Sequence, residues 1–147
     1  MNPDNLQFVE CTRDDASELA ELRARAMEPS LRKVGRFDEQ RVRSRFLDSF
    51  VTENTRKIVA DDVLCGFYVL KRNSDHHYLD HLYVDPEFQG QGIGHAVMRE
   101  VLRESEASGL PVRLGALRES RANEFYQSLG FKQTHEDAFD IYYEYSG

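Results

Sequence analysis

Hydrophobic positions recur along the chain with two different periods. Short segments alternate apolar and polar residues or run apolar throughout, which is typical of strands, and longer segments repeat apolar residues every three or four positions, which is typical of helices. The strand-like segments are residues 6–11, 57–60, 63–70, 78–84, 112–117, 131–134 and 139–145. The helix-like segments are residues 15–26, 38–50, 94–108 and 121–129. This order predicts an α/β fold with a mixed central sheet flanked by helices.

Turn and capping residues mark where these elements end. Residues 61–62 predict a hairpin turn, Pro29 is expected to break the first helix, and Ser120 to cap the last one. Gly109 is typical of the position just after a helix end. Because a strand, a helix and another strand follow one another over residues 78–117, these two strands are expected to lie parallel.

The most informative stretch is the strand, glycine-rich loop and helix of residues 78–101. An Asp-Pro pair at residues 85–86 stops the strand, and Gly90, Gly92 and Gly94 precede the helix. Glycines allow successive backbone N–H groups to face outward, and the first N–H groups of a helix have no partner within it. The sequence therefore predicts that this loop and helix start bind an anion such as a diphosphate.

Other glycine-rich loops fit the residues less well. A dinucleotide fingerprint that starts at Gly90 and Gly92 requires a third glycine at position 95, which is His95. A nucleoside-triphosphate P-loop requires a lysine at its end, and none stands there. A helix start without a ligand would carry three glycines at a cost of roughly 0.5–1 kcal/mol each relative to alanine. A phosphate-binding role is the better interpretation.

Two motifs here resemble a known family. Residues 89–94 read Gln-Gly-Gln-Gly-Ile-Gly, which matches the Gln/Arg-x-x-Gly-x-Gly/Ala signature of the GNAT superfamily of N-acetyltransferases. The preceding Leu-Tyr-Val-Asp-Pro-Glu-Phe at residues 82–88 is also typical of that family. Residues 123–131 resemble its Asn-x-x-Tyr-x-x-x-Gly-Phe segment, in the expected order. The resemblance covers the chain well from about residue 50 onward.

The resemblance implies a single GNAT domain over residues 1–147 with acetyl-CoA as co-substrate. The pantetheine arm would enter between the strands of residues 78–84 and 112–117 and pair with backbone groups. One backbone N–H there would polarise the acetyl carbonyl. The residues expected to bind acetyl-CoA are Leu82, Tyr83, Val84, Gln89, Gly90, Gln91, Gly92, Ile93, Gly94, Asn123 and Tyr126.

The resemblance also places Tyr126 near the sulfur of the thioester, as the general acid that protonates the departing thiolate. The alternative is a tyrosine that packs in the core with its hydroxyl at the surface. For the general base, strand alternation puts Tyr78, Asp80 and Leu82 on one face. Residues 77, 79, 81 and 83 are expected on the other. Family members carry a strand base at positions that match Tyr78 or Asp80.

Asp80 is the first candidate for the base, since a carboxylate takes a proton directly or through water if burial raises its pKa. His81 and His77 remain candidates because the ordinary pKa of histidine suits the task. The remaining alternative is that Asp80 only hydrogen-bonds near the substrate and that ordered water deprotonates the amine.

The resemblance implies direct attack by a primary amine of a small-molecule acceptor in a ternary complex. Two alternatives stay open. The first is a module that holds an acyl-CoA without transferring the acyl group, although such a module has no need of Tyr126. The second is an acetyltransferase that acts on a protein N-terminus or lysine.

Arginines are dense in the region of the first two helices, at positions 23, 25, 32, 36, 41, 43 and 45. They are expected to form solvated helix faces paired with nearby Glu and Asp. In the resembled family, however, this region forms a wall of the acceptor site, where an arginine could hold an acceptor carboxylate or phosphate. The formal charge of −7 would instead suit a cationic amine, so the two observations conflict.

Composition narrows the remaining possibilities. The net charge of −7 argues against general nucleic-acid binding, and no apolar run is long enough to span a membrane. The N-terminus does not read as a signal peptide. Cys11 and Cys65 are expected to be reduced thiols in or near the core of a cytoplasmic protein, without a metal partner at useful spacing. The tyrosine-rich strand of residues 142–145 is expected at an edge of the sheet, where it either pairs with a second subunit, since the resemblance implies a homodimer, or is solvated.

Overall fold

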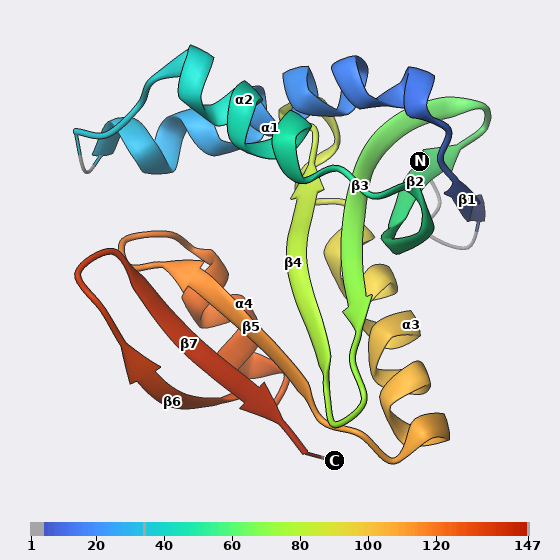
Figure 1. Ribbon diagram of the computed structural model, residues 1–147, viewed down its shortest axis with the longest axis vertical. Helices are drawn as coiled ribbons and strands as arrows, with labels where there is room; N and C mark the ends of the chain where they lie inside the picture. Colours follow the sequence, from blue (N-terminus) through green and yellow to red (C-terminus); the bar gives the residue numbers. More distant parts are fainter. Residues whose placement is uncertain (1–4, 34, 147) are drawn as a thin grey trace.

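The computed structural model describes residues 5–33 and 35–146, which form one seven-stranded sheet in the order β1-β2-β3-β4-β5-β7-β6 (Figure 1). The expected strands are all present, and their bounds are β1 Leu6–Glu10, β2 Thr55–Ala60, β3 Val63–Arg72, β4 His77–Val84, β5 Val112–Leu117, β6 Lys132–Glu136 and β7 Asp140–Tyr145. Asp61 and Asp62 form the β2–β3 turn with φ values of 50° and 65°, a conformation that aspartate tolerates better than most residues.

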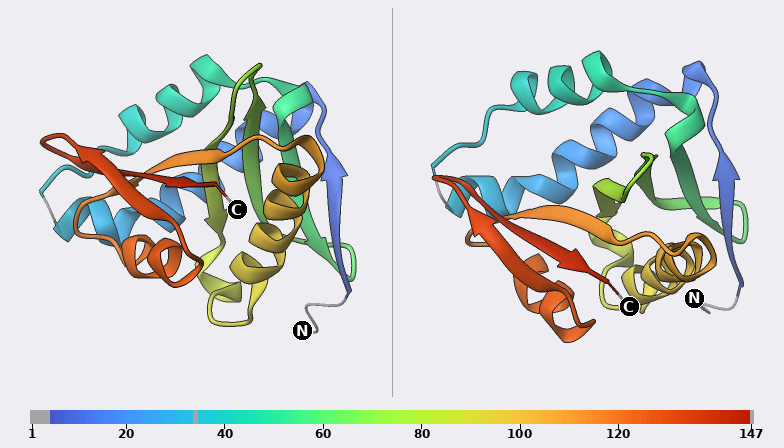
Figure 2. Two further views of the ribbon diagram at one scale, coloured as in Figure 1. Left: turned by 90° about the horizontal axis from the view of Figure 1, so that it is seen from below. Right: turned by 60° about the horizontal axis from the view of Figure 1, so that its bottom comes forward.

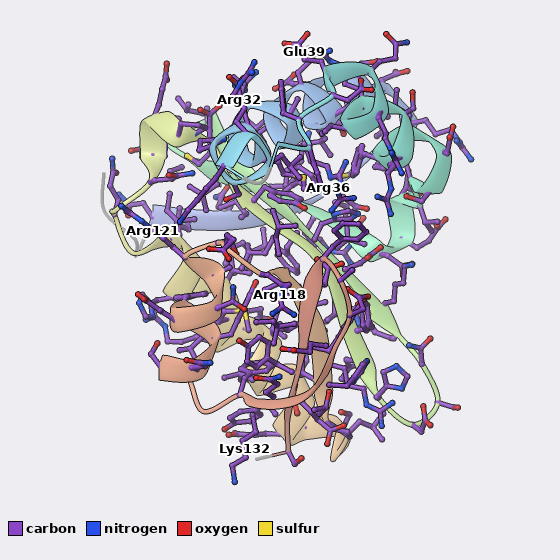
Figure 3. All side chains as sticks on the ribbon, turned by 90° about the vertical axis from the view of Figure 1, so that its left-hand side faces the viewer. Arg32, Arg36, Glu39, Arg118, Arg121 and Lys132 are labelled. Atoms are coloured by element: carbon purple, nitrogen blue, oxygen red, sulfur yellow. The ribbon has the colours of Figure 1, made fainter. Side chains whose placement is uncertain are left out.

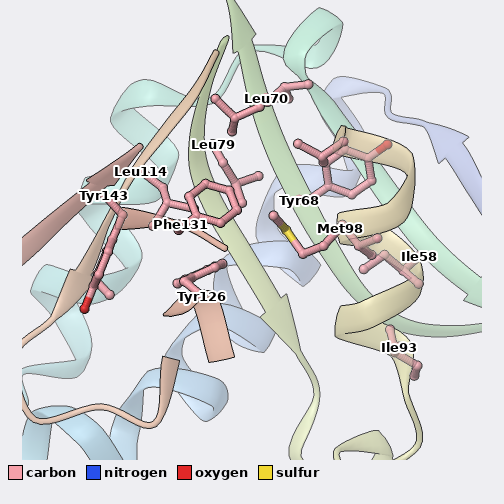
Figure 4. Close-up of a cluster of buried hydrophobic side chains, with 14 of the residues drawn as sticks. Ile58, Tyr68, Leu70, Leu79, Ile93, Met98, Leu114, Tyr126, Phe131 and Tyr143 are labelled. Carbon is pink, nitrogen blue, oxygen red and sulfur yellow. The ribbon is translucent and has the colours of Figure 1, made fainter. Parts of the chain in front are cut away.

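Within the described part of the chain, four α-helices cover the two faces of the sheet (Figure 2). They are α1 Ala16–Lys33, α2 Glu39–Ser49, α3 Ile93–Ser108 and α4 Ala122–Ser128. Helices α3 and α4 enclose the main core on one face, where Leu79, Leu114 and Phe131 are buried with Met98 (Figure 4). Helices α1 and α2 enclose a second cluster against β3 on the opposite face, which contains Leu19, Leu22, Phe46, Phe67 and Val69. The sheet is therefore the middle layer of three.

Every strand pair is antiparallel except β4 and β5, which are parallel as expected. The parallel pairing joins only three residues of each strand, His77–Leu79 with Val112–Leu114. Beyond Leu79 and Leu114 the two strands diverge, and β5 continues its pairing on the other side with β7 (Figure 1). The sheet is thus split in its middle, at the end of β4 that leads into the glycine-rich loop.

Three sequence-based expectations about the elements are wrong. Helix α1 continues through Pro29 to Lys33, because burial of Leu31 in a cluster with Val42 of α2 holds the last turn in place. Ser120 does not cap α4; its hydroxyl donates to the Leu117 carbonyl at 2.8 Å, and the helix begins after Arg121. Strand β7 is no edge, since it lies between β5 and β6, so the argument for a subunit contact along it fails.

Cys11 and Cys65 are both buried, as expected. None of the helices in the described part of the chain combines the length and hydrophobicity that a membrane span requires.

Candidate active site

The divergence of β4 from β5 leaves backbone groups of β4 without a strand partner. The N–H of Asp85 donates to the Cys65 carbonyl at 2.7 Å, so it points toward β3. Backbone groups alternate in direction along a strand, and the N–H groups of Val84 and Leu82 therefore point away from β3, toward the gap. These donors are placed to bind an extended ligand in the manner of a missing strand.

A β-bulge in β4 changes which side chains share a face. Val69 pairs with His81 and Leu70 with Leu79, so Asp80 is the extra residue of the bulge. Simple alternation had placed Leu79 with His81 and Asp80 with Leu82, and both groupings are wrong. The observed faces are set by packing contacts: His77, Leu79, Leu82 and Val84 lie toward α3, whereas Tyr78, Asp80, His81 and Tyr83 lie toward α1 and α2.

The glycine-rich loop ends in a helix start that has no capping group of its own. Gly90 and Gly92 have φ values of 82° and 80°, which non-glycine residues rarely adopt. The first helical bond of α3 runs from the Ala96 N–H to the Gly92 carbonyl at 3.1 Å, so the N–H groups before Ala96 have no helical acceptor. No side chain caps the helix and no acidic residue lies in its first turn. An anion would complete this helix end.

Other loop residues tie this helix start to the gap and to α4. The side-chain amide of Gln89 donates to the Val84 carbonyl at 3.0 Å. The side-chain oxygen of Gln91 is buried and has no hydrogen-bond partner among the described residues. A Cβ on Gly94 would lie 3.3 Å from the Phe125 ring, so the absence of a side chain allows α3 and α4 to approach closely.

Tyr126 is buried on α4, with its ring against Phe131 at a centroid distance of 5.7 Å. Its hydroxyl forms no hydrogen bond with any described residue. Burial raises the pKa of Tyr126 well above its usual 10, with a smaller contribution from nearby Tyr83. A protonated hydroxyl without a protein acceptor is available to donate to a ligand.

Asn123 is fully occupied by contacts within the protein. Its amide nitrogen donates to the carbonyls of Leu117, Arg118 and Ser120 at 2.8, 3.2 and 3.0 Å. Its side-chain oxygen accepts from the Tyr143 hydroxyl at 2.9 Å. Asn123 thus fixes the turn between β5 and α4, on which the position of Tyr126 depends.

The four candidates for the general base lie in different surroundings. Asp80 is 3.2 Å from the Lys71 ammonium and 3.6 Å from Nε2 of His81, and its side chain is 27% exposed rather than buried. Burial lowers the pKa of His81 to about 4, which leaves the ring neutral at pH 7. Nε2 of His77 is 2.9 Å from the Ser108 hydroxyl of α3, on the far side of the sheet. Burial raises the pKa of Tyr78.

A cavity of about 400 Å³ opens between α1, α2 and the end of the sheet. Its wall includes Leu117 at the end of β5, and also Phe139 and Asp140, which begin or precede β7. No local pattern indicated these last two residues, because about a hundred positions separate them from the helices that they face. The guanidinium carbon of Arg36 lies 3.6 Å from the centroid of the Phe139 ring, and both residues line the cavity. Arg36 is one of the side chains labelled in Figure 3.

The arginines of α1, of α2 and of the segment between them fall into two groups. Arg25, Arg32 and Arg43 form ion pairs with Asp85, Glu28 and Glu21, so the expectation of solvated, paired arginines is correct for them. The other four line the cavity and form no ion pair with any residue of 5–33 or 35–146: Arg23, Arg36, Arg41 and Arg45.

Comparison with known proteins agrees with this geometry. The acetyltransferase (GNAT) domain family matches residues 48–133. A stretch of 79 residues is 32% identical to the ribosomal protein bS18–alanine N-acetyltransferase of Salmonella typhimurium, over 52% of this chain and 53% of that protein. The chain therefore spans about half the length of this curated relative.

Solved structures share the fold over most of the chain. The PaiA N-acetyltransferase of Thermoplasma acidophilum, in complex with coenzyme A, superposes with a TM-score of 0.80 at 21% identity, over 97% of this chain and 99% of that one. The ribosomal-protein-S18-alanine N-acetyltransferase of Escherichia coli gives a TM-score of 0.69 at 19% identity, over 95% and 92%. With the split sheet, the uncapped helix and a family match across more than half of its length, this chain belongs to the GNAT family of acetyl-CoA-dependent acetyltransferases.

Proposed function

We propose that this acetyltransferase transfers the acetyl group of acetyl-CoA to the primary amine of a small molecule, by direct attack in a ternary complex. The observation that carries the proposal is the divergence of β4 from β5. Strand β4 leads into the uncapped start of α3, and the end of β5 reaches the cavity at Leu117. A thioester held along β4 would have its diphosphate at the helix start and its acetyl group toward the cavity.

The backbone provides most of the binding in this proposal. The diphosphate would lie on the loop of residues 89–94, where the free N–H groups of α3 stabilise negative charge. The pantetheine arm would pair with residues 82–84. An N–H that points into the gap, from Leu82 or Val84, would donate to the acetyl oxygen and stabilise the tetrahedral oxyanion.

Side chains would then carry out two proton transfers. The amine nitrogen attacks the acetyl carbon, the carbon–sulfur bond breaks, and the thiolate takes a proton from the Tyr126 hydroxyl. The amine loses its own proton to a base on the α1–α2 face of β4 or to water ordered there. Asp80 and His81 lie on that face, whereas the contact of His77 with Ser108 favours a structural role for His77. Asn123 would act by positioning Tyr126 rather than by touching acetyl-CoA.

A second acceptor class is favoured by one observation. The relative from Salmonella typhimurium is named for acetylating an alanine of a ribosomal protein, and a protein N-terminus is also a primary amine. The cavity of about 400 Å³ has the size of a small-molecule site, which supports a small amine as the acceptor. Comparing a free amine with a peptide that begins with alanine separates the two.

The first experiment measures the melting temperature of the protein with excess acetyl-CoA. At 100 times the dissociation constant, a ligand of the native state adds about 2.7 kcal/mol of stability, which corresponds to a rise of roughly 5–10 °C for a domain of this size. Acetate and NAD serve as controls and are expected to leave the melting temperature unchanged. Release of the free thiol in the presence of primary amines then tests transfer. No rise with acetyl-CoA would refute the proposed binding mode.

A further inference from the structure

Arg23 is the only buried arginine among the residues that the structure describes, with 6% of its surface exposed. Its Nη1 donates to the Val42 carbonyl of α2, and its guanidinium carbon lies 5.7 Å from the centroid of the Tyr83 ring on β4. Its Nε has no hydrogen-bond partner within the described part of the chain. Arg23 also donates a hydrogen bond to the side chain of Tyr83. A carbonyl and a tyrosine side chain are uncharged, so they do not neutralise a full positive charge.

A buried charge without an ionic partner is costly, and proteins usually avoid it. The chain supplies carboxylates readily to its other arginines: Arg25, Arg32 and Arg43 on the same two helices each have one. Arg23, which is the most buried of these arginines, therefore has no ionic partner among the described residues. The missing negative charge is one that a ligand can supply.

The side chains near Arg23 are mostly positively charged as well. Arg36, Arg41 and Arg45 line the same cavity and are likewise without an ion pair to any described residue. Two aspartates share the wall. Asp38 is engaged as the cap of α2, where its carboxylate accepts from the Arg41 N–H at 3.2 Å, and Asp140 sits at the start of β7. In a chain with a net charge of −7, a concave site in which arginines outnumber acidic residues two to one marks a site for an anion.

We propose that the acceptor is an amine that also carries a carboxylate, and that Arg23 binds this carboxylate at the floor of the cavity. The inference rests on the proposed function, because it names the class of molecule that the acyl-transfer site takes. Arg23 packs against Tyr83 of β4, the strand along which the thioester would lie, so few bonds separate the carboxylate from the reacting amine. A compact amino acid has this arrangement, whereas a polyamine or an aminoglycoside has no group for Arg23.

The test compares matched acceptors that differ only in charge. Thiol release from acetyl-CoA is measured with a set of free L-amino acids, β-alanine and 4-aminobutyrate, and with the carboxamide of each. At least one acid is expected to exceed its carboxamide in kcat/KM by about 100-fold, since the amide leaves the guanidinium uncompensated. Equal use of acids and amides, or turnover confined to polyamines, phosphorylated amines or an alanine-initiated peptide, would overturn the inference.

Three variants assign the effect to Arg23. Arg23→Met is expected to reduce kcat/KM for the acid by about 100-fold and to change that for the amide by less than threefold, and Arg23→Lys is expected to restore part of the loss. Arg32→Met is the matched control, because Arg32 lies on the same helix, pairs with Glu28 and does not line the cavity. Equal losses for acid and amide in Arg23→Met would contradict a role in carboxylate binding.

The melting temperature of the ligand-free variants separates this inference from the proposed function. If the charge of Arg23 is compensated only when a ligand binds, Arg23→Met removes an uncompensated buried charge from the ligand-free protein. The melting temperature of this variant is then expected to equal or exceed that of the wild type. A decrease of more than roughly 5 °C would identify Arg23 as a structural residue and overturn the inference. If acetyl-CoA raises the melting temperature but no amine is acetylated, the proposed acceptor reaction fails, and this stability measurement still decides about Arg23.

Discussion

Replacing Tyr126 by phenylalanine separates the two roles that this residue can have. The hydroxyl forms no hydrogen bond with a described residue, so its removal leaves no protein group unsatisfied, and the ring contact with Phe131 is kept. The melting temperature of Tyr126→Phe is therefore expected to stay within about 2 °C of the wild type. If the hydroxyl protonates the leaving thiolate, kcat is expected to fall by about 10²–10⁴-fold, the usual contribution of a general acid.

Tyr143→Phe is the matched control, because Tyr143 is also a buried tyrosine of the same core. Its hydroxyl donates to Asn123 at 2.9 Å and accepts from Gln127 at 3.3 Å. Removing it leaves the buried Asn123 oxygen without its donor, which costs about 1–3 kcal/mol, or roughly 3–10 °C in melting temperature. The two variants should thus differ in opposite ways: one loses rate and keeps stability, and the other loses stability and keeps most of its rate.

The assay is thiol release at saturating acetyl-CoA and amine, alongside thermal denaturation of the same samples. Because burial raises the pKa of Tyr126, the hydroxyl keeps its proton up to and beyond pH 10, and the wild-type rate is not expected to decline below about pH 10 through loss of this proton. A Tyr126→Phe variant that keeps its rate and loses stability would refute the general-acid role and assign Tyr126 to packing.

Three further predictions test the frame of the site. Gly66→Ala would place a Cβ 2.3 Å from the Tyr83 carbonyl oxygen, so it is expected to lower the free energy of unfolding in urea by about 3 kcal/mol. The control Gly109→Ala meets no atom but has a φ of +73°, and it is expected to lower this free energy by about 1 kcal/mol. Similar losses in the two variants would contradict the close packing of the strands at Gly66. His95→Glu adds a negative charge to the first turn of α3. Relative to His95→Gln, calorimetry is expected to show a ligand-free protein that is more stable by about 0.3–1 kcal/mol and binds acetyl-CoA about tenfold more weakly. Unchanged binding would place the diphosphate elsewhere. Burial lowers the pKa of His81 from 6.5 to about 4, so the unfolded chain binds a proton in this window that the folded protein does not, and stability should fall as the pH decreases from 6.5 to 4. His81→Gln should flatten this decline in denaturation curves, and an equally steep decline would assign it to other groups.

Local signals in the sequence determined the elements and the nature of the site. Periodicity identified all seven strands and the four helices, because each buries one face and therefore repeats its apolar residues at a fixed spacing. The Asp-Pro stop and the glycines at 90, 92 and 94 predicted a strand, a turn and an uncapped helix start, since these conformations are properties of the residues themselves. The resemblance to GNAT enzymes rested on the same stretch and is confirmed by the family match.

Only the tertiary structure decided the features that depend on distant neighbours. The bulge at Asp80 changes which side chains of β4 share a face of the sheet. No local sequence pattern predicts one extra residue in a strand. Pro29 stayed inside a helix because α2 packs against the turn that follows it, and β7 moved to the sheet interior because β6 pairs with its free side. The sequence likewise could not divide its arginines into paired and unpaired, since whether Arg23 has a carboxylate within reach is decided by where α1, α2 and β4 meet. Turns, helix ends and helix or strand periodicity depend on residues that are neighbours in the sequence, so the sequence predicts them. Burial and charge pairing depend on segments that are distant in the sequence, so they are known only from the tertiary structure.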